Sequence, residues 1–251
     1  MPALVLAGGK TPPEFAAAAG VPETSGSRAL ADINGLPMVR YVLRALQAAS
    51  TVGEVILVSP PGASDQPEAD RRVEADRDFA GNISAGLEQC KDAEFVLIVT
   101  ADLPFLTPEA VDAFVSEGLS RGADCCYAGI PKEACDERFP GMRRTYLHAR
   151  NGSFTGGNVV LQRVSAFPRQ AEMVREAYLR RKNPAFLARL IGPSNLVKFF
   201  LRRLTQQDLE ESVSRLLGVR CSLILTRFAE LGTDIDKPDD LALARRMLHP
   251  G

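Results

Sequence analysis

Histidine is scarce in this chain. Its 251 residues include only His148 and His249, and the second stands beside the carboxyl end. The five cysteines, at positions 90, 125, 126, 135 and 221, show no CxxC spacing. Because zinc sites draw on histidine and on spaced cysteines, a histidine-based zinc site is close to excluded, and a Ser-His-Asp mechanism would rest on His148 alone. Unspaced cysteines in odd number predict reduced thiols and a cytoplasmic protein.

The chain also lacks long apolar runs and a net charge of either sign. No run reaches the roughly 18–20 apolar residues that span a bilayer, and no charged-then-apolar signal peptide opens the sequence. Lys and Arg number 30 against 31 Asp and Glu. We therefore expect neither a membrane nor a nucleic acid as a partner.

The first half of the sequence alternates short apolar runs with segments of helical period. Expected strands cover residues 3–6, 54–58, 71–74, 95–100 and 125–129, and expected helices cover 37–49, 79–90 and 108–121. Strands that alternate with helices at this spacing predict an α/β fold with a mostly parallel, doubly wound sheet. At this length we expect a single domain over 1–251. In such sheets ligands bind beyond the carboxyl ends of the strands.

The second half departs from this alternation. A strand is expected at 154–161, then an almost wholly helical stretch at 163–217, then a strand at 221–226 and a closing helix at 241–248. We interpret 163–217 as a helical insertion. Residues 14–27 are rich in Ala, Gly, Pro and Ser, and this composition predicts a long mobile loop that closes over a ligand.

The first expected strand runs into a glycine turn. Leu6 and Ala7 lead to Gly8, Gly9 and Lys10. Paired glycines allow a sharp turn that presents backbone N–H groups, and the lysine adds a positive charge at the carboxyl end of the strand. This combination suits a triphosphate, and an ordinary turn after the first strand is the plain alternative.

Carboxylates follow two of the expected strands. Asp102 stands just after one, while Asp234 and Asp236 are two residues apart, so that in an extended segment both point to one face. Hard divalent cations take carboxylate and phosphate oxygens, and we predict a Mg²⁺ site of Asp102, Asp234 and Asp236. Asp239 and Asp240 are expected to cap the last helix. A turn or capping role is the alternative for Asp102.

Four short blocks, in order, give the chain a resemblance to a known family. The blocks are 6–9 (LAGG), 28–38 with its RAL and NGLPM segments, 101–106 (ADLPFL) and 234–241 (DIDKPDDL). They resemble blocks of the MobA-like nucleotidyltransferases, the molybdenum-cofactor guanylyl- and cytidylyltransferase type. The resemblance implies a GT-A-like Rossmann fold, a three-layer sandwich. It also implies Mg²⁺-dependent transfer of a nucleoside monophosphate from a triphosphate to a phosphorylated acceptor, with release of pyrophosphate.

The resemblance further implies roles for individual residues. Nucleotide contacts fall to Leu6, Ala7, Gly8, Gly9, Lys10, Arg28, Asn82 and Asp102, and acceptor contacts to Gly157 and Asn158. Asp102, Arg28 and Lys10 would be catalytic. The side chains of Arg28 and Lys10 would hold the leaving pyrophosphate. CTP or GTP is the expected nucleotide and an anionic small molecule the expected acceptor. A phosphate acceptor is already ionised at neutral pH, so no general base is needed. A helix cap for Asn82 and a β-bulge at the second-half glycines are the plain alternatives.

Two departures keep other functions open. The family carries an arginine and then a lysine soon after the opening block, whereas here Thr11 to Ser27 intervene and Arg28 stands where the lysine is expected. Arginine keeps the charge but changes the geometry. The rival enzyme is a GT-A glycosyltransferase that uses a nucleotide sugar, although Asp102 is followed by Leu-Pro rather than by a second aspartate two residues on. A non-catalytic nucleotide-binding regulator is the rival of another class.

The helical stretch 163–217 has no counterpart in the resemblance. It carries apolar residues, Val197, Phe199, Phe200, Leu201 and Leu204, among basic ones, Arg180, Arg181, Lys182, Arg189, Lys198, Arg202 and Arg203. Two interpretations stand: a cap over the acceptor site that recognises an anion, and a homodimer interface.

Overall fold

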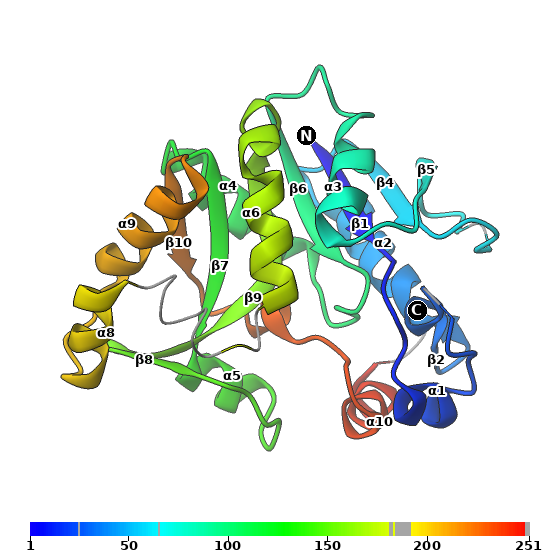
Figure 1. Cartoon of the computed structure of the whole chain (residues 1–251). Coiled ribbons are helices and arrows are strands. Elements are labelled where there is room, and N and C mark those ends of the chain that lie inside the picture. Colours follow the sequence, from blue (N-terminus) through cyan, green and yellow to red (C-terminus); the bar gives the residue numbers. More distant parts are fainter. Residues whose placement is uncertain (25, 65, 181–182, 184–191, 249–251) are drawn as a thin grey trace.

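The computed structural model describes residues 1–24, 26–64, 66–180, 183 and 192–248. A central sheet carries helices on both faces and forms a three-layer α/β sandwich (Figure 1). The strands of the sheet are β1 (Pro2–Leu6), β4 (Glu54–Ser59), β5 (Arg71–Glu74), β6 (Phe95–Thr100), β7 (Cys125–Pro131), β8 (Leu147–Ala149), β9 (Gly152–Arg163) and β10 (Cys221–Leu225). They lie in the order β10-β7-β9-β6-β1-β4-β5, and β8 pairs with β9.

Parallel pairing links β5, β4, β1 and β6, and it also links β7 with β10. β9 runs antiparallel to both β6 and β7. The predicted α/β fold with a mostly parallel sheet is confirmed. The alternation of strands and helices seen in the first half of the sequence ends at the antiparallel β9. A separate two-stranded ribbon, β2 (Asp32–Ile33) and β3 (Leu36–Pro37), was not predicted.

Helices cover the two faces of the sheet. They are α1 (Pro13–Ala19), α2 (Met38–Ala48), α3 (Phe79–Leu87), α4 (Pro108–Ser120), α5 (Lys132–Arg138), α6 (Phe167–Arg180), α8 (Pro193–Phe200), α9 (Gln206–Leu217) and α10 (Pro238–Met247), with short 3-10 turns η1 (Ser27–Leu30), η2 (Val164–Ala166) and η3 (Ala229–Gly232). Residues of β1 alternate between two cores: Val5 packs with α2 and α4, and Leu4 packs with α3 and α6. This period of two explains why the apolar opening run forms a strand buried on both faces.

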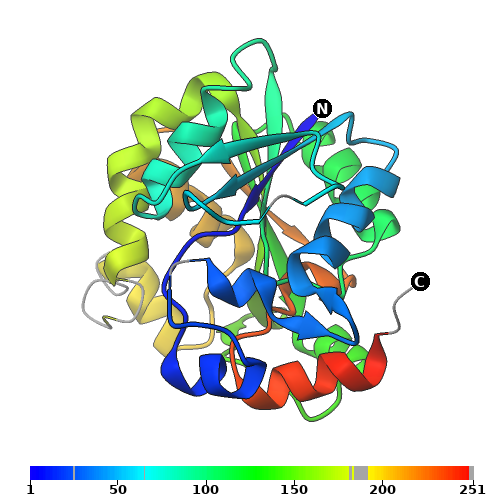
Figure 2. The ribbon, with the colours of Figure 1, turned by 90° about the vertical axis from the view of Figure 1, so that its right-hand side faces the viewer.

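The prediction of a mobile loop over residues 14–27 is wrong for its first part. α1 begins with Pro13 in its first turn and ends at Gly20, which has φ 68. Phe15 is fully buried, and α1 lies beside α10 (Figure 2). Alanine has the highest helix propensity, so the small residues that suggest mobility instead favour a short packed helix. Residue 25 lies outside the described part of the chain.

The described part of the stretch 163–217 is mostly helical, in η2, α6, α8 and α9, while Arg163 still belongs to β9 and residues 201–205 form a turn between α8 and α9. α6 packs on α3 and buries Phe167 in the core, so its first part belongs to a helix layer of the sandwich. Arg181, Lys182 and Arg189 lie outside the described residues. No helix in the described part of the chain is both long and apolar enough to cross a membrane.

Candidate active site

Two chain segments bring three carboxylates together beyond the carboxyl end of β6. Asp102 lies in the turn that follows β6, and Asp234 and Asp236 lie between η3 and α10. The N–H of Ile235 donates to the carbonyl of Asp102, with 2.9 Å between N and O. Ile235 is fully buried, and the aspartates on either side of it face the site, as an extended segment requires. Carboxylate oxygens of Asp102, Asp234 and Asp236 all lie within 4.8 Å of one another.

The three carboxylates differ in burial: Asp102 is buried, Asp234 is half-buried and Asp236 is exposed. Asp102 is only 7% exposed, and its Oδ1 has no hydrogen-bond partner among the described residues. Burial raises the pKa of Asp102, and the Arg28 guanidinium opposes this only in part. Burial, together with the neighbouring Asp102 and Asp236, raises the pKa of Asp234 to about 7. Such a cluster is stabilised by added positive charge.

Arg28 supplies some of that charge. Its Nη2 lies 2.9 Å from Asp102 Oδ2, and its Nη1 pairs with Asp236 Oδ1. Burial lowers the pKa of Arg28, but the surrounding carboxylates outweigh burial and raise it above its usual value. The sequence predicts Arg28 as a phosphate ligand and gives no sign of this pairing, which joins residues 208 positions apart.

Thr11 and Gly26 hold the segment that carries Arg28. Thr11 is buried, and its Oγ1 accepts from the N–H of Arg28 at 3.0 Å. Gly26 has φ 75, and its N–H donates to the carbonyl of Gly9 at 3.0 Å. A Cβ at Gly26 would lie 2.7 Å from the carbonyl oxygen of Ala7, so this position requires glycine. Sequence analysis missed Thr11 and Gly26, because only their long-range contacts reveal their role.

The glycine turn after β1 lies against the start of α3. A Cβ at Gly8 would lie 2.8 Å from Nδ2 of Asn82, so the missing side chain lets the amide approach the turn. Asn82 is 6% exposed, and its Oδ1 accepts from the N–H of Arg77 at 2.9 Å. Gly9 has φ 100, a conformation that favours glycine. The structure thus brings Gly8, Gly9 and Asn82 together, as a shared nucleotide site would need.

The other predicted nucleotide-binding residues differ in which of their groups a nucleotide could contact. The side chains of Leu6 and Ala7 are buried in the two cores, so only their backbone can face a nucleotide. Lys10 is exposed and forms no ion pair within the described part of the chain. Its charge is therefore available to an anion, in contrast to the charge of Arg28.

α6 reaches the same side of the sheet and adds residues that no motif indicated. The ring of Tyr178 stacks on Phe79 with centroids 4.5 Å apart and planes inclined by 6°. Arg175 Nε donates to Asp78 Oδ2 at 2.7 Å, and Asp78 caps α3. The carboxyl half of α6 therefore borders the site, which fits a covering role for this part of the helical stretch.

The predicted acceptor residues lie on β9 next to η3. Gly157 is buried, and a Cβ there would lie 2.8 Å from Cβ of Ala128 and 2.9 Å from the carbonyl oxygen of Leu231. Close packing of β9 against β7 and η3 therefore accounts for this glycine. Asn158 is half-buried. Acceptor contacts from Gly157 and Asn158 stay a prediction.

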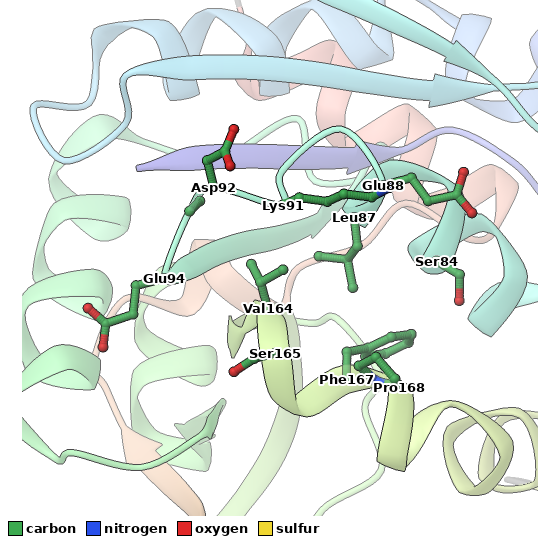
Figure 3. Close-up of a pocket in the computed structure, with 11 residues that line it drawn as sticks. Ser84, Leu87, Glu88, Lys91, Asp92, Glu94, Val164, Ser165, Phe167 and Pro168 are labelled. Atoms are coloured by element: carbon green, nitrogen blue, oxygen red, sulfur yellow. The ribbon is translucent and has the colours of Figure 1, made fainter.

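A cavity of about 600 Å³ lies at the opposite end of the sheet, between the end of α3 and the start of α6 (Figure 3). Leu87, Val164 and Phe167 form its apolar wall, and Glu94 at its rim precedes β6. None of the predicted site residues lines it. The candidate site and this cavity are therefore separate places in the molecule.

Solved structures share the fold. A hypothetical transferase from Thermus thermophilus superposes with a TM-score of 0.83 at 37% identity, over 96% of this chain and 98% of that one. The 2-C-methyl-D-erythritol 4-phosphate cytidylyltransferase of Thermus thermophilus superposes with a TM-score of 0.55 at 16% identity, over 98% of this chain and 97% of that one. The second likeness concerns the fold alone.

Two curated relatives found by sequence comparison are guanylyltransferases. The chain is 24% identical over 185 residues to a probable molybdenum cofactor guanylyltransferase from Thermococcus gammatolerans, covering 73% of this chain and 89% of the relative. It is 37% identical over 93 residues to a phosphoenolpyruvate guanylyltransferase from Sphaerobacter thermophilus, covering 35% of this chain and 45% of the relative. The MobA-like NTP transferase domain family matches residues 3–207. The chain therefore belongs to the MobA-like NTP transferase domain family and is a nucleotidyltransferase.

Proposed function

We propose that this protein transfers a nucleoside monophosphate from a nucleoside triphosphate to a phosphorylated small-molecule acceptor, with Mg²⁺ and with release of pyrophosphate. One observation carries the proposal. Three carboxylates converge within 4.8 Å beyond the carboxyl end of β6, where α/β sheets bind their ligands, and one of them has a buried oxygen with no partner in the described part of the chain. Asp234 and Asp236 lie outside the residues 3–207 that the family matches. Their part in the proposed site is supported instead by their proximity to Asp102.

The donor set suits a magnesium ion. Carboxylate oxygens are the ligands that hard divalent cations prefer, and Asp102 Oδ1 is a buried acceptor that a cation would satisfy. Asp102, Asp234 and Asp236 would hold the ion, and the bound ion would neutralise charge on the reacting phosphates. Because Arg28 pairs with Asp102 and Asp236, its guanidinium and the ion would compete for the charge of the same two carboxylates.

The residues of the chain would mainly position charged groups. The backbone of the glycine turn and the ammonium of Lys10 would bind the β- and γ-phosphates and stabilise the leaving pyrophosphate. Arg28, once released from the carboxylates, would reach the same phosphates. The acceptor phosphate is ionised at neutral pH and attacks without a general base. Catalysis of this kind rests on positioning and charge neutralisation.

The identity of the nucleotide is supported by relatives rather than by geometry. The two curated relatives named above are a probable molybdenum cofactor guanylyltransferase and a phosphoenolpyruvate guanylyltransferase. A cytidylyltransferase shares the fold at 16% identity. We therefore propose GTP or CTP as the donor and an anionic phosphorylated molecule as the acceptor. A cytoplasmic location stays a prediction from the cysteine content.

A pyrophosphate-release assay tests the function. Purified protein is incubated with Mg²⁺, each of the four common nucleoside triphosphates, and a panel of phosphorylated acceptors that includes phosphoenolpyruvate. The expected result is pyrophosphate release that needs both an acceptor and Asp102 and is lost in Asp102→Asn. Asp92→Asn, an exposed aspartate at the other end of the sheet, is the matched control.

Two outcomes would favour the rival functions. Transfer of a sugar from a nucleotide sugar, with no pyrophosphate from any triphosphate, would support the glycosyltransferase. Tight triphosphate binding by calorimetry, with no turnover on a broad acceptor panel, would support the non-catalytic regulator.

A further inference from the structure

The strands β7 and β10 form a parallel pair at one edge of the sheet (Figure 1), and the first residue of each is a cysteine. Cys125 and Cys221 are register partners in this parallel pair. Neighbouring strands lie roughly 4.8 Å apart, and residues in register on a sheet point to the same face. Disulfides form when Cα atoms are about 4.4–6.8 Å apart. The backbone therefore already holds Cys125 and Cys221 at bridging distance.

The adjacent Cys126 shows why the pair is specific. Side chains alternate along a strand, so Cys126 faces the opposite side, where it is fully buried and its Sγ donates to the carbonyl of Gly118 at 3.5 Å. Cys125 and Cys221 are instead both partly exposed and in the thiol form, and the Sγ of Cys221 donates to the carbonyl of Val219 at 3.7 Å. Cys90 and Cys135 are buried elsewhere in the fold.

The two thiols also interact directly. The neighbouring Cys221 and burial raise the pKa of Cys125 well above its usual value, whereas the neighbouring Cys125 lowers the pKa of Cys221 although burial opposes this. Ser214 of α9 also lowers the pKa of Cys221, while burial and, to a smaller extent, Asp124 and Glu210 raise it. A lowered pKa increases the fraction of thiolate, the nucleophilic form. Cys221 is thus set to react first and Cys125 to react second.

We propose that Cys125 and Cys221 form an oxidisable dithiol, which a peroxide converts to an intramolecular disulfide. This modification site lies at the amino ends of β7 and β10, away from the three carboxylates, and it does not depend on the proposed catalytic function.

The chemistry balances with hydrogen peroxide as the oxidant. The Cys221 thiolate attacks one peroxide oxygen, the O–O bond breaks, and hydroxide leaves while a sulfenic acid forms at Cys221. The Cys125 sulfur then attacks the Cys221 sulfur, the S–O bond breaks, and the hydroxide leaves with the Cys125 proton as water. The two sulfurs lose two electrons in total, and the peroxide becomes two waters.

The crosslink would act on the strand that leads to the site. β10 is an edge strand, and the chain continues from it through η3 to Asp234 and Asp236. A bridge at Cys221 fixes the start of this strand to β7 and closes a long loop, which restricts the unfolded chain. We expect oxidation to raise Tm by several degrees.

The test treats the reduced full-length protein with a small excess of hydrogen peroxide, blocks free thiols with an alkylating agent, and maps disulfides by mass spectrometry. The expected result is one crosslinked peptide pair joining Cys125 to Cys221, with Cys90, Cys126 and Cys135 alkylated only after unfolding. A dithiol reductant should reverse the crosslink and the rise in Tm.

Variants complete the test. Cys221→Ser should abolish both the crosslink and the Tm shift, and Cys125→Ser should leave Cys221 as a sulfenic acid that a sulfenate-specific probe labels. Cys90→Ser, the control, should behave as the wild type. Oxidation of Cys221 to sulfinic acid in the wild type without a crosslink would overturn the proposal, as would oxidation of the buried thiols before this pair.

Discussion

Two aspartates show how differently this protein uses a carboxylate. Asp112 on α4 accepts hydrogen bonds from the backbone N–H and hydroxyl groups of Ser50 and Thr51, at 2.6–2.9 Å. Despite some burial, the hydrogen bonds from Thr51 and Ser50 lower its pKa to about 2. Asp102 instead keeps one buried oxygen that no described residue contacts by a hydrogen bond, and burial raises its pKa. The carboxylate of Asp112 stabilises the fold through its hydrogen bonds, whereas that of Asp102 has an oxygen left to bind a ligand.

The largest effect is expected at Asp102. Asp102→Asn keeps the shape and removes the charge that would hold Mg²⁺, so we expect turnover to fall by roughly a thousandfold or more. The variant should fold normally, because it removes a charge that burial disfavours. Pyrophosphate release and thermal melting measure the two quantities. Near wild-type turnover would remove Asp102 from the metal site.

The reverse pattern is expected at Asp112. Asp112→Ala leaves N–H and hydroxyl groups of Ser50 and Thr51 without their acceptor, at a cost of about 1–3 kcal/mol. For a domain of this size Tm should fall by roughly 2–10 °C, with unchanged turnover below the melting range. A variant that loses turnover at unchanged Tm would break the comparison with Asp102.

Arg28 forms ion pairs with two carboxylates of the candidate metal site, Asp102 and Asp236. If its guanidinium competes with the metal, Arg28→Met should bind Mn²⁺ several-fold more tightly than the wild type without nucleotide, while its affinity for triphosphate falls. Electron paramagnetic resonance of free Mn²⁺ and calorimetry measure the two affinities. Lys10→Ala is the matched control: it should lose triphosphate affinity with Mn²⁺ binding unchanged, because Lys10 pairs with none of the described carboxylates. Weaker Mn²⁺ binding in Arg28→Met would show that Arg28 supports the metal site.

The sequence predicts the parts of this site that depend on local order. Apolar runs locate β1, β4 and β6 almost to the residue, since a strand buried on both faces needs continuous apolar sequence. The spacing of Asp234 and Asp236 predicts their common face, because residues two apart in an extended segment point to the same side. Asp240 was correctly expected at a cap, as its carboxylate accepts from the N–H of Lys237.

Long-range contacts mark where prediction from sequence ends. The pairing of Arg28 with Asp236 and the stack of Tyr178 on Phe79 depend on how distant elements pack. No periodicity encodes them. The antiparallel direction of β9 is also hidden, because a strand pattern reads the same in both directions. The mobile-loop prediction for α1 fails for a different reason: Pro13 and Gly20 are typical end signals of a short helix, and composition alone does not reveal them.

A smaller effect is expected in the pH dependence of stability. The pKa of Asp234 is about 7, above the ordinary 3.8. Between these values the folded protein holds more protons than the unfolded chain, so the free energy of unfolding should fall as pH rises from about 4 to about 7. Melting curves in metal-free buffer measure this slope, and Asp234→Asn should flatten it. An equal slope in the variant would assign the pH dependence to other groups.

The smallest effect is expected on the basic surface after α8, which contrasts with the acidic site. Arg202 and Arg203 are exposed, and Phe200 and Leu201 beside them are 74% and 60% exposed. If this segment caps the acceptor site, reversing both charges with Arg202→Glu and Arg203→Glu should raise the KM for the acceptor by roughly threefold to tenfold and leave the KM for triphosphate unchanged. Arg215→Glu, an exposed arginine on the neighbouring α9, is the control. An unchanged acceptor KM, with a smaller particle by light scattering, would assign the segment to a homodimer interface, where apolar side chains and arginines are both common.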